Sequence, residues 1–189
     1  MKQIIVLGRG GQGAVTSSQV LAIAAFKDGK ASLAFPNFGV ERTGAPVRSY
    51  CRIDSKPITL REQVYEADYA IVLDPTLLKG LTEKITGTII VNSNKKPEDL
   101  GIVTKAKVKC VDITSTALKV IGKPFVNIAA LGAFAGITGE VTLKSLEEAI
   151  ALQMGSKGPM VEKNIAAIRE VYETAKTCGH ENGKCEVKK

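Results

Sequence analysis

The stretch Gln3-Ile4-Ile5-Val6-Leu7-Gly8-Arg9-Gly10-Gly11-Gln12-Gly13 places an apolar, β-branched run directly before a glycine-rich segment. The run predicts a buried strand, and a helical pattern begins immediately after Gly13. Gly8, Gly10 and Gly13 have the G-x-G-x-x-G spacing of a strand–turn–helix unit, in which backbone N–H groups and a helix N-terminus can face a phosphate. Glycine is needed there because a Cβ would block the tight turn and the approach of an anion. A turn that binds no ligand is the alternative interpretation of this spacing.

The rest of the chain repeats this alternation of strands and helices. At 189 residues it is long enough for one well-packed domain and short for two. Aromatic residues make up only 5% and there is no Trp, which suits a core of small aliphatic side chains around a buried parallel sheet. We therefore expect an α/β fold with a doubly wound, mostly parallel sheet flanked by helices, in a Rossmann-like three-layer arrangement with a helical C-terminal third. Residues 1–177 are expected to form a single domain, and residues 178–189 a polar tail that contains Cys and His.

Several segments carry more specific expectations. Short helices are predicted over residues 60–66 and 76–85. Residues 126–136 are apolar on nearly all sides and contain two glycines that permit close contact, which predicts a central helix or a subunit interface. The polar segments 8–13, 74–76 and 92–94 each follow a predicted strand directly, so they should share one rim of the sheet.

The formal charge of +7 comes largely from scattered lysines. A nucleic-acid-binding surface normally shows a clustered basic stripe with interleaved aromatic or arginine residues, so we expect no nucleic-acid partner. A basic surface suits an anionic ligand or an acidic partner subunit, as well as plain solvation. The chain enters a strand almost at once, and its most apolar helical run is shorter than the roughly 20 residues that span a bilayer. These features predict no signal peptide, no membrane association and a cytoplasmic location.

The four cysteines give no metal-site pattern. Cys51 and Cys110 fall within predicted strands and are expected to be buried thiols. Cys178 and Cys185 flank His180 in the tail, but the spacing C-x-H-x4-C lacks a fourth ligand and matches no usual zinc pattern. Free thiols or a tail disulfide are therefore expected, with no metal and no iron–sulfur cluster.

The sequence shows no recognisable pattern of catalytic residues. The only histidine lies in the tail, which argues against Ser–His–Asp or Cys–His nucleophiles, and no pair of carboxylates stands out as acid and base. The second predicted strand ends in Phe35-Pro36-Asn37, without the acidic residue that holds a dinucleotide ribose. This argues against a nicotinamide dehydrogenase and leaves a phosphate or pyrophosphate cradle, or a structural turn. No catalytic residue is predicted.

A long loop follows that strand and, with the glycine turn, carries a family resemblance. Residues 36–46 read Pro-Asn-Phe-Gly-Val-Glu-Arg-Thr-Gly-Ala-Pro, and loops of this length in a compact domain are usually functional. The combination of G-x-G-G-Q-G at 8–13 with F-G-x-E-R-x-G-A-P at 38–46 resembles the gamma subunit of 2-oxoacid:ferredoxin oxidoreductases, most of all that of the pyruvate enzyme (pyruvate synthase). Segments 47–54, 74–75 and 92–93 also look like that family, so the resemblance covers the chain up to the tail.

The resemblance implies a non-catalytic subunit, inactive alone, that helps bind coenzyme A during the oxidative decarboxylation of a 2-oxoacid to an acyl-CoA. Thiamine diphosphate and the iron–sulfur clusters would be held by partner subunits (alpha, beta and a ferredoxin-type delta), none by this chain. Ferredoxin would accept the electrons. Pyruvate is the expected substrate, and 2-oxoglutarate, branched-chain 2-oxoacids and indolepyruvate are the alternatives.

The glycine turn and two later polar residues are the expected ligand contacts: Gly8, Arg9, Gly10, Gly11, Gln12, Gly13, Thr16 and Asn92. The last four residues of the turn would present N–H groups to a phosphate, and Arg9 would add a charge-assisted hydrogen bond. Loop residues are expected to order the loop or to contact a partner subunit: Phe38, Gly39, Glu41, Arg42 and Gly44. Two other classes stay open, a stand-alone nucleotide-binding oxidoreductase and a structural assembly subunit whose turn binds nothing.

Overall fold

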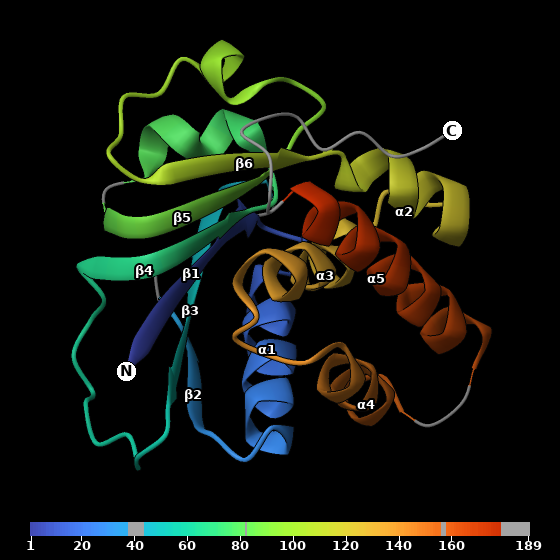
Figure 1. Cartoon of the computed structure of the whole chain (residues 1–189), viewed down its shortest axis with the longest axis horizontal. Coiled ribbons are helices and arrows are strands. Elements are labelled where there is room, and N and C mark those ends of the chain that lie inside the picture. The colour runs from blue at the N-terminus through green and yellow to red at the C-terminus, as the bar shows by residue number, and fades with distance from the viewer. Residues whose placement is uncertain (38–43, 82, 156–157, 179–189) are drawn as a thin grey trace.

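The computed structural model describes residues 1–37, 44–81, 83–155 and 158–178, which form one six-stranded sheet with its α-helices packed to one side (Figure 1). The strands are β1 (Lys2–Arg9), β2 (Ala31–Pro36), β3 (Pro46–Asp54), β4 (Glu66–Val72), β5 (Lys84–Asn92) and β6 (Lys107–Val111). The α-helices are α1 (Ala14–Lys27), α2 (Ile113–Ile121), α3 (Val126–Thr138), α4 (Leu143–Gln153) and α5 (Pro159–Cys178). Two short 3-10 helices, η1 (Pro75–Gly80) and η2 (Pro97–Leu100), follow β4 and β5.

The strand order is β2-β3-β1-β4-β5-β6. Strands β1, β4, β5 and β6 are parallel, whereas β3 runs antiparallel to both β1 and β2. The predicted α/β fold with a mostly parallel sheet is confirmed. Strand β3 reverses because a loop, rather than a crossover helix, connects it to β2. The carboxyl ends of β1, β4 and β5 therefore lie on one rim.

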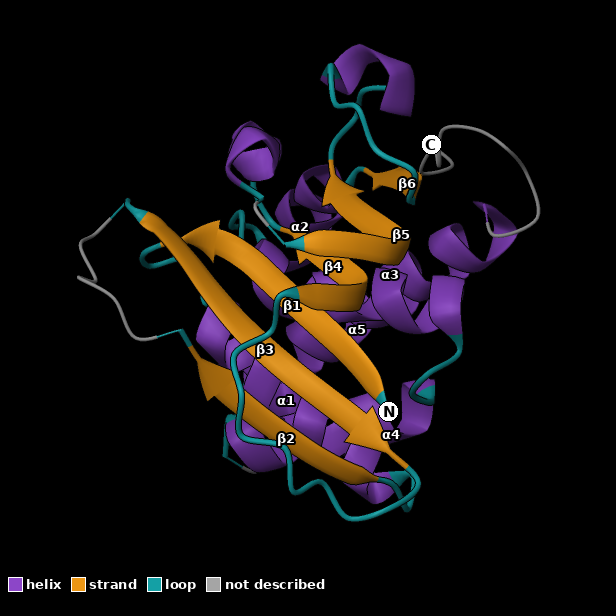
Figure 2. Cartoon of the chain, turned by 90° about the vertical axis from the view of Figure 1, so that its left-hand side faces the viewer, coloured by secondary structure: helices purple, strands orange, loops and turns teal. Residues whose placement is uncertain are grey.

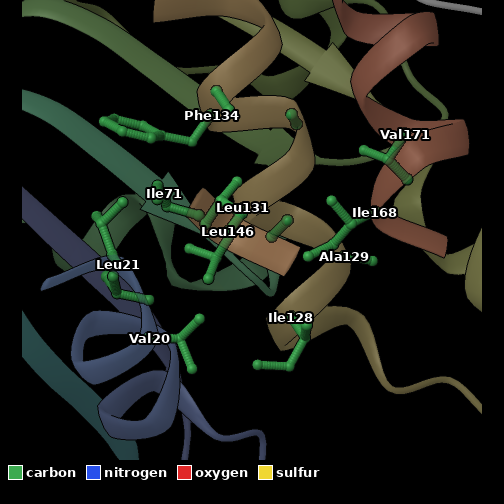
Figure 3. Packing of buried hydrophobic residues seen from close by; sticks show 14 of the residues in the cluster. Val20, Leu21, Ile71, Ile128, Ala129, Leu131, Phe134, Leu146, Ile168 and Val171 are labelled. Carbon is green, nitrogen blue, oxygen red and sulfur yellow. The ribbon is translucent and has the colours of Figure 1, made fainter. Parts of the chain in front are cut away.

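Each face of the sheet carries its own hydrophobic cluster. The larger cluster lies between the sheet and the helices, where side chains of α1, α3, α4 and α5 meet (Figure 3). The smaller cluster lies on the opposite face, where Val64, Leu77, Leu78 and Ala106 are buried over the central strands. The third layer is thus built from 3-10 helices and irregular segments, and the segment after β3 crosses in front of that strand (Figure 2).

Helix α3 is the centre of the helical layer and is buried on nearly all sides. A Cβ on Gly132 would lie 2.5 Å from the carbonyl oxygen of Ile168, and a Cβ on Gly136 would lie 2.7 Å from that of Tyr172. The backbones of α3 and α5 therefore touch, which only residues without a side chain allow at these positions. The central-helix interpretation of this apolar run is confirmed.

Of the two short helices predicted at 60–66 and 76–85, the first is wrong and the second is shorter than predicted. Residues 60–65 are irregular because the fully buried Arg52 donates hydrogen bonds to the carbonyl oxygens of Leu60 (2.8 Å) and Glu62 (2.6 Å), which are then lost to helical bonding. After β4, only Pro75–Gly80 is helical, as the 3-10 helix η1. Residues 84 and 85 instead belong to β5, where Lys84 pairs with Glu66 and Ile85 with Ala67.

Asp28 joins the end of α1 to the start of α4. Its carboxylate accepts hydrogen bonds from the Thr142 N–H (2.8 Å), the Thr142 hydroxyl (2.7 Å) and the Ser145 hydroxyl (2.5 Å). Burial raises the pKa of Asp28, but the hydrogen bonds from Ser145 and Thr142 outweigh it and hold that pKa below its usual value. The ionised form of Asp28 therefore stabilises the fold.

Within the described residues, no helix combines the length and the apolar character that crossing a membrane requires.

Gly132→Ala should destabilise the protein by about 1–3 kcal/mol, because its methyl group would collide with the α5 backbone. The loss should appear although Ala favours helix over Gly by about 1 kcal/mol. Thermal unfolding measures the effect. Gly80→Ala is the control, since a Cβ at Gly80 meets nothing within 4 Å and Gly80 has no positive φ. Equal stability of the two variants would contradict the backbone contact.

Asp28→Asn should lower the free energy of unfolding at pH 7 by about 1 kcal/mol, because it removes the charge that accepts three hydrogen bonds. Since the folded-state pKa is depressed, this contribution is present above about pH 4 and is lost as the pH falls through the folded-state value. Urea unfolding of wild type and variant at pH 7 and pH 3 should therefore show a gap that shrinks in acid. Asp99→Asn, an exposed carboxylate without an ion pair or side-chain hydrogen bond among the described residues, is the control. A gap that persists unchanged at pH 3 would refute this role.

Candidate functional site

Three polar segments meet at the carboxyl rim of the sheet, as the sequence predicts. Arg9, at the end of β1, donates from Nε to Asp74 Oδ2 (2.6 Å) and from Nη2 to the Thr76 hydroxyl (2.7 Å) after β4. Asn92, at the end of β5, donates from Nδ2 to the carbonyl oxygen of Leu73 (3.0 Å). The rim thus gathers the glycine turn, the start of η1 and the end of β5.

The glycine turn offers fewer free N–H groups than predicted. The N–H of Gly10 donates to the Ala45 carbonyl and the N–H of Gln12 donates to the Arg9 carbonyl, each at 2.8 Å. The N–H groups of Gly11 and Gly13 have no partner among the described residues. Both have positive φ, 92° and 78°, which favours glycine at these positions. Two of the four predicted N–H groups therefore remain for a ligand.

Helix α1 begins at this turn with an open N-terminus. Its N-cap, Gly13, has no capping side chain, and the first turn of the helix contains no acidic residue. Its unsatisfied N–H groups and partial positive charge therefore face the rim. A Cβ on Gly13 would lie 2.5 Å from Asn127 Nδ2 on α3, so the Asn127 side chain would have to move if Gly13 were replaced.

A cleft of about 580 Å³ lies between the glycine turn and the starts of α3 and α5. It is lined by five of the predicted site residues: Gly11, Gln12, Gly13, Thr16 and Asn92. The remaining three do not line it. Gly8 lies within β1, where a Cβ would be 3.0 Å from Leu73 Cδ1, and Gly10 is bonded to Ala45.

Arg9 acts within the chain as a brace. Besides Asp74 and Thr76, its guanidinium donates from Nη1 to the carbonyl oxygen of Gly44 (3.1 Å). Burial raises the pKa of Asp74, but hydrogen bonds from Thr76 and Arg9 outweigh it and hold that pKa below its usual value. Contact of Arg9 with a ligand stays a prediction, and in the structure its three nitrogens bind protein atoms.

Asn92 is also fully engaged. Its Oδ1 accepts hydrogen bonds from the N–H groups of Ile113 (3.2 Å) and Thr114 (3.1 Å), and its Nδ2 donates to Leu73 and to the Thr114 hydroxyl (2.9 Å). The side chain therefore ties the end of β5 to the start of α2. A direct bond to a ligand stays a prediction.

A second cleft of about 630 Å³ adjoins the first along the rim. It lies between η1, η2 and the start of α2, and shares Asn92 and Thr114 with the first cleft. Its charged lining residues are Lys79, Lys95, Asp99 and Asp112.

Of the five predicted loop residues, the structure describes only Gly44. Phe38, Gly39, Glu41 and Arg42 lie outside the described residues. Gly44 is described: its N–H donates to the Gly10 carbonyl (3.2 Å), and its own carbonyl accepts from Arg9. The end of the loop is thus bonded to the glycine turn.

A buried network that the sequence analysis missed lies beside the other end of the loop. The Tyr50 hydroxyl donates to Glu83 Oε1 (2.9 Å), and burial together with Glu83 raises the pKa of Tyr50 to about 12. Arg48 Nε lies 3.2 Å from Glu83 Oε1, within ion-pair distance although not aligned for a hydrogen bond. The Arg48 carbonyl accepts from the Asn37 N–H (3.0 Å). These groups hold the chain where the loop leaves β2.

The cleft also contains residues that the sequence analysis did not predict: Phe125, Asn127, Met154, Met160 and Asn164. Only Asn127 gave a signal, as an amide at the start of an otherwise apolar helix. Phe125 is the N-cap of α3, Met154 is the C-cap of α4, and Met160 and Asn164 lie on α5. Their approach to the turn depends on tertiary packing.

No cluster of three or more metal-ligating side chains occurs in the part of the chain that the structure describes. Burial raises the pKa of the Cys51 thiol to about 12 and, with Glu98, that of Cys110 to about 11, so both thiols are unreactive near neutral pH. The tail, with His180, Cys185 and the side chain of Cys178, lies outside the described residues.

Comparisons with known proteins agree with one another. The family model for pyruvate ferredoxin/flavodoxin oxidoreductase matches residues 3–174. The pyruvate synthase subunit PorC of Methanosarcina barkeri is 53% identical over 154 residues, which are 79% of this chain and 85% of that protein. The pyruvate/ketoisovalerate oxidoreductases common subunit gamma of Pyrococcus furiosus is 49% identical over 173 residues, 88% of this chain and 92% of that protein.

Solved structures share the fold. The crystal structure of the pyruvate oxidoreductase subunit PORC of Thermotoga maritima aligns with a TM-score of 0.79 at 36% identity, covering 92% of this chain and 97% of that one. A 2-oxoglutarate:ferredoxin oxidoreductase from Magnetococcus marinus aligns with a TM-score of 0.76 at 20% identity, over 94% of this chain and 32% of that one, which shows the fold alone. As the glycine turn and the following loop predict, the chain belongs to the pyruvate ferredoxin/flavodoxin oxidoreductase family, among the gamma (PorC) subunits.

Proposed function

We propose that this chain is the gamma subunit of a multisubunit pyruvate:ferredoxin oxidoreductase and that it helps bind coenzyme A in that complex. The observation that carries the proposal is the open N-terminus of α1, with the free N–H groups of Gly11 and Gly13, at the rim of a chain of this family. A helix N-terminus with free N–H groups favours a phosphate, because donors and the helix dipole act together.

The names of the relatives support the assignment to a complex. They are called subunits of pyruvate synthase or a common subunit of pyruvate and ketoisovalerate oxidoreductases. The Magnetococcus enzyme, which contains a region with this fold, carries coenzyme A and succinyl-CoA. In the proposed complex, alpha, beta and delta subunits hold thiamine diphosphate and iron–sulfur clusters, which supply decarboxylation and electron transfer to ferredoxin.

The role of this chain in that reaction is binding and orientation. The glycine turn borders a cleft with polar and apolar walls, and the described lining of that cleft contains no acid–base pair. Holding coenzyme A in position makes its reaction with a partner-bound intermediate effectively unimolecular, which is a large contribution to rate.

A structural assembly subunit is the second candidate. The observation that favours it is the internal use of Arg9 and of the N–H groups of Gly10 and Gln12, which hold the turn together without a ligand. A stand-alone nucleotide-binding oxidoreductase has no comparable support, because the residues that the structure describes around the cleft include no acidic one to hold a ribose.

Anaerobic affinity purification of the tagged native chain tests the assignment to a complex. The chain should co-purify with thiamine-binding and iron–sulfur subunits, and the preparation should reduce a dye with pyruvate only when coenzyme A is present. Recovery of the chain alone, binding a nucleotide without such partners, would move the assignment to the stand-alone class.

Gly11→Leu in the assembled complex should raise the KM for coenzyme A roughly tenfold, equivalent to about 1.4 kcal/mol of binding. A Cβ at Gly11 meets nothing within 4 Å, so the side chain would occupy space at the turn rather than clash with the fold. Steady-state kinetics at saturating pyruvate measure the effect.

Gly29→Leu is the matched control, because Gly29 also has positive φ and open space but lies at the opposite end of α1. Gly29→Leu likewise places a side chain at positive φ and should leave the KM unchanged. Equal effects of the two variants on stability, with no change in KM for either, would favour the structural subunit.

A further inference from the structure

Arg9 is bonded to residues on both sides of its own strand. Its Nε, Nη1 and Nη2 each donate one hydrogen bond, to the carboxylate of Asp74, the carbonyl oxygen of Gly44 and the hydroxyl of Thr76, respectively. Gly44 precedes β3 and the other two acceptors follow β4, and these two strands flank β1 in the sheet. The planar guanidinium suits this arrangement because its N–H groups donate in fixed directions. One side chain therefore links the end of β1 to both neighbouring strands.

Arg9, Asp74 and Thr76 form a closed ring of hydrogen bonds. The Thr76 hydroxyl accepts from Arg9 and donates to Asp74 Oδ1 (2.6 Å), and the Thr76 N–H donates to the same oxygen (2.9 Å). The other carboxylate oxygen, Oδ2, accepts from Arg9 Nε. The bonds of such a network strengthen one another, and the Asp74 side chain is only 18% exposed. The ring is therefore a firmer connection than a lone ion pair on the surface.

The ring is attached to a turn that has little else to order its tip. The Arg9 N–H donates to Gln12 Oε1 (2.7 Å), which closes the turn on itself. The N–H groups of Gly11 and Gly13 have no partner among the described residues, so the bonded residues beside them set their direction. Glycine has more backbone freedom to lose than any other residue. Without a brace, the ligand itself would have to order this turn, which would reduce affinity.

We propose that Arg9 and Asp74 are positioning residues for coenzyme A, which hold the glycine turn so that the N–H groups of Gly11 and Gly13 are oriented before the ligand binds. This inference rests on the proposed function, because it concerns the same turn and the same ligand. In this role Arg9 acts through the turn, and its charge is balanced by Asp74. The internal bonds of Arg9 then have a measurable consequence for the binding of coenzyme A.

Direct contact of Arg9 with a phosphate of coenzyme A is the competing role. It is chemically possible because the guanidinium has more N–H donors than its three bonds use. The two roles differ in their dependence on Asp74. A bond from Arg9 to a phosphate persists when Asp74 is removed, whereas the brace is lost.

A double-mutant cycle in the assembled complex separates the two roles. Arg9→Met and Asp74→Ala should each raise the KM for coenzyme A roughly tenfold, while kcat at saturating coenzyme A changes by less than about twofold. The double variant should have the KM of the single variants, because both changes remove the same brace. An effect of Arg9→Met that persists undiminished in the Asp74→Ala background would overturn the proposal, since Arg9 would then act on the ligand independently of Asp74.

Two milder variants guard against misfolding. Thr76→Val removes the hydroxyl at nearly constant volume, keeps the N–H that donates to Asp74, and should raise the KM roughly threefold. Arg9→Lys keeps the charge on a single nitrogen, which cannot reach all three acceptors in the directions of a guanidinium, so its KM should stay at least about threefold above that of wild type. A wild-type KM in Arg9→Lys would show that a positive charge alone is sufficient and would contradict the brace.

Arg169→Met is the matched control. Arg169 also binds a carboxylate, donating from Nε and Nη2 to Glu147 at 2.6 Å and 2.8 Å, and it lines neither cleft. Its replacement should leave the KM unchanged. Thermal unfolding is measured beside the kinetics for every variant. Lower stability of Arg9→Met and Asp74→Ala with an unchanged KM would mean that the ring is only structural, and that result also overturns the proposal.

Failure of the proposed function has a different signature. The rate of the wild-type complex would then show no saturable dependence on coenzyme A, so that no KM exists to compare. Failure of this inference alone leaves that dependence intact, with a KM that is insensitive to Asp74.

Discussion

At Gly13 the first turn of α1 approaches α3 so closely that even a methyl group would overlap Asn127. This contact brings the glycine turn from the start of the chain next to helices from its last third, and the cleft lies between them. Because α3 is itself held against α5 through Gly132, the position of the cleft wall follows from two close contacts. The Asn127 side chain lies against Gly13, and the backbones of α3 and α5 meet at Gly132. The site is thus a product of helix packing as much as of the turn.

Most of the fold follows from local pattern. The β-branched runs give β1 and the other central strands, and the uniformly apolar stretch gives the buried α3, because hydrophobic periodicity reports burial directly. The direction of β3 and the irregular segment that Arg52 holds do not follow, since the first depends on pairing with β1 at the start of the chain and the second on a side chain of the preceding strand. The guanidinium of Arg52 binds two carbonyl groups of this segment and overrides its local preference for helix.

The site is predictable to a lesser extent. The turn itself is visible in the sequence because positive φ requires glycine at Gly11 and Gly13. The roles of the neighbouring polar groups are not visible in the sequence, because the protein partners of Arg9 and Asn92 come together only in the folded sheet. The same holds for Asn164, which reaches the cleft from the other end of the chain. Residue type indicates how many hydrogen bonds a side chain can form, whereas tertiary structure decides which partners form them.

The saturated side chain of Asn92 has a consequence for how tightly anything can bind at this rim. Its carbonyl oxygen accepts from two N–H groups of α2, and its amide donates to Leu73 and Thr114. These bonds fix the boundary that the two clefts share at Asn92 and Thr114, here called the ridge, without a ligand. A ligand that settles against this ridge loses its own freedom but does not have to order the protein there. The free energy of binding at this ridge is therefore determined by the contacts formed, because the protein loses little conformational entropy there. The fixed shape of the ridge favours ligands that fit it without rearrangement.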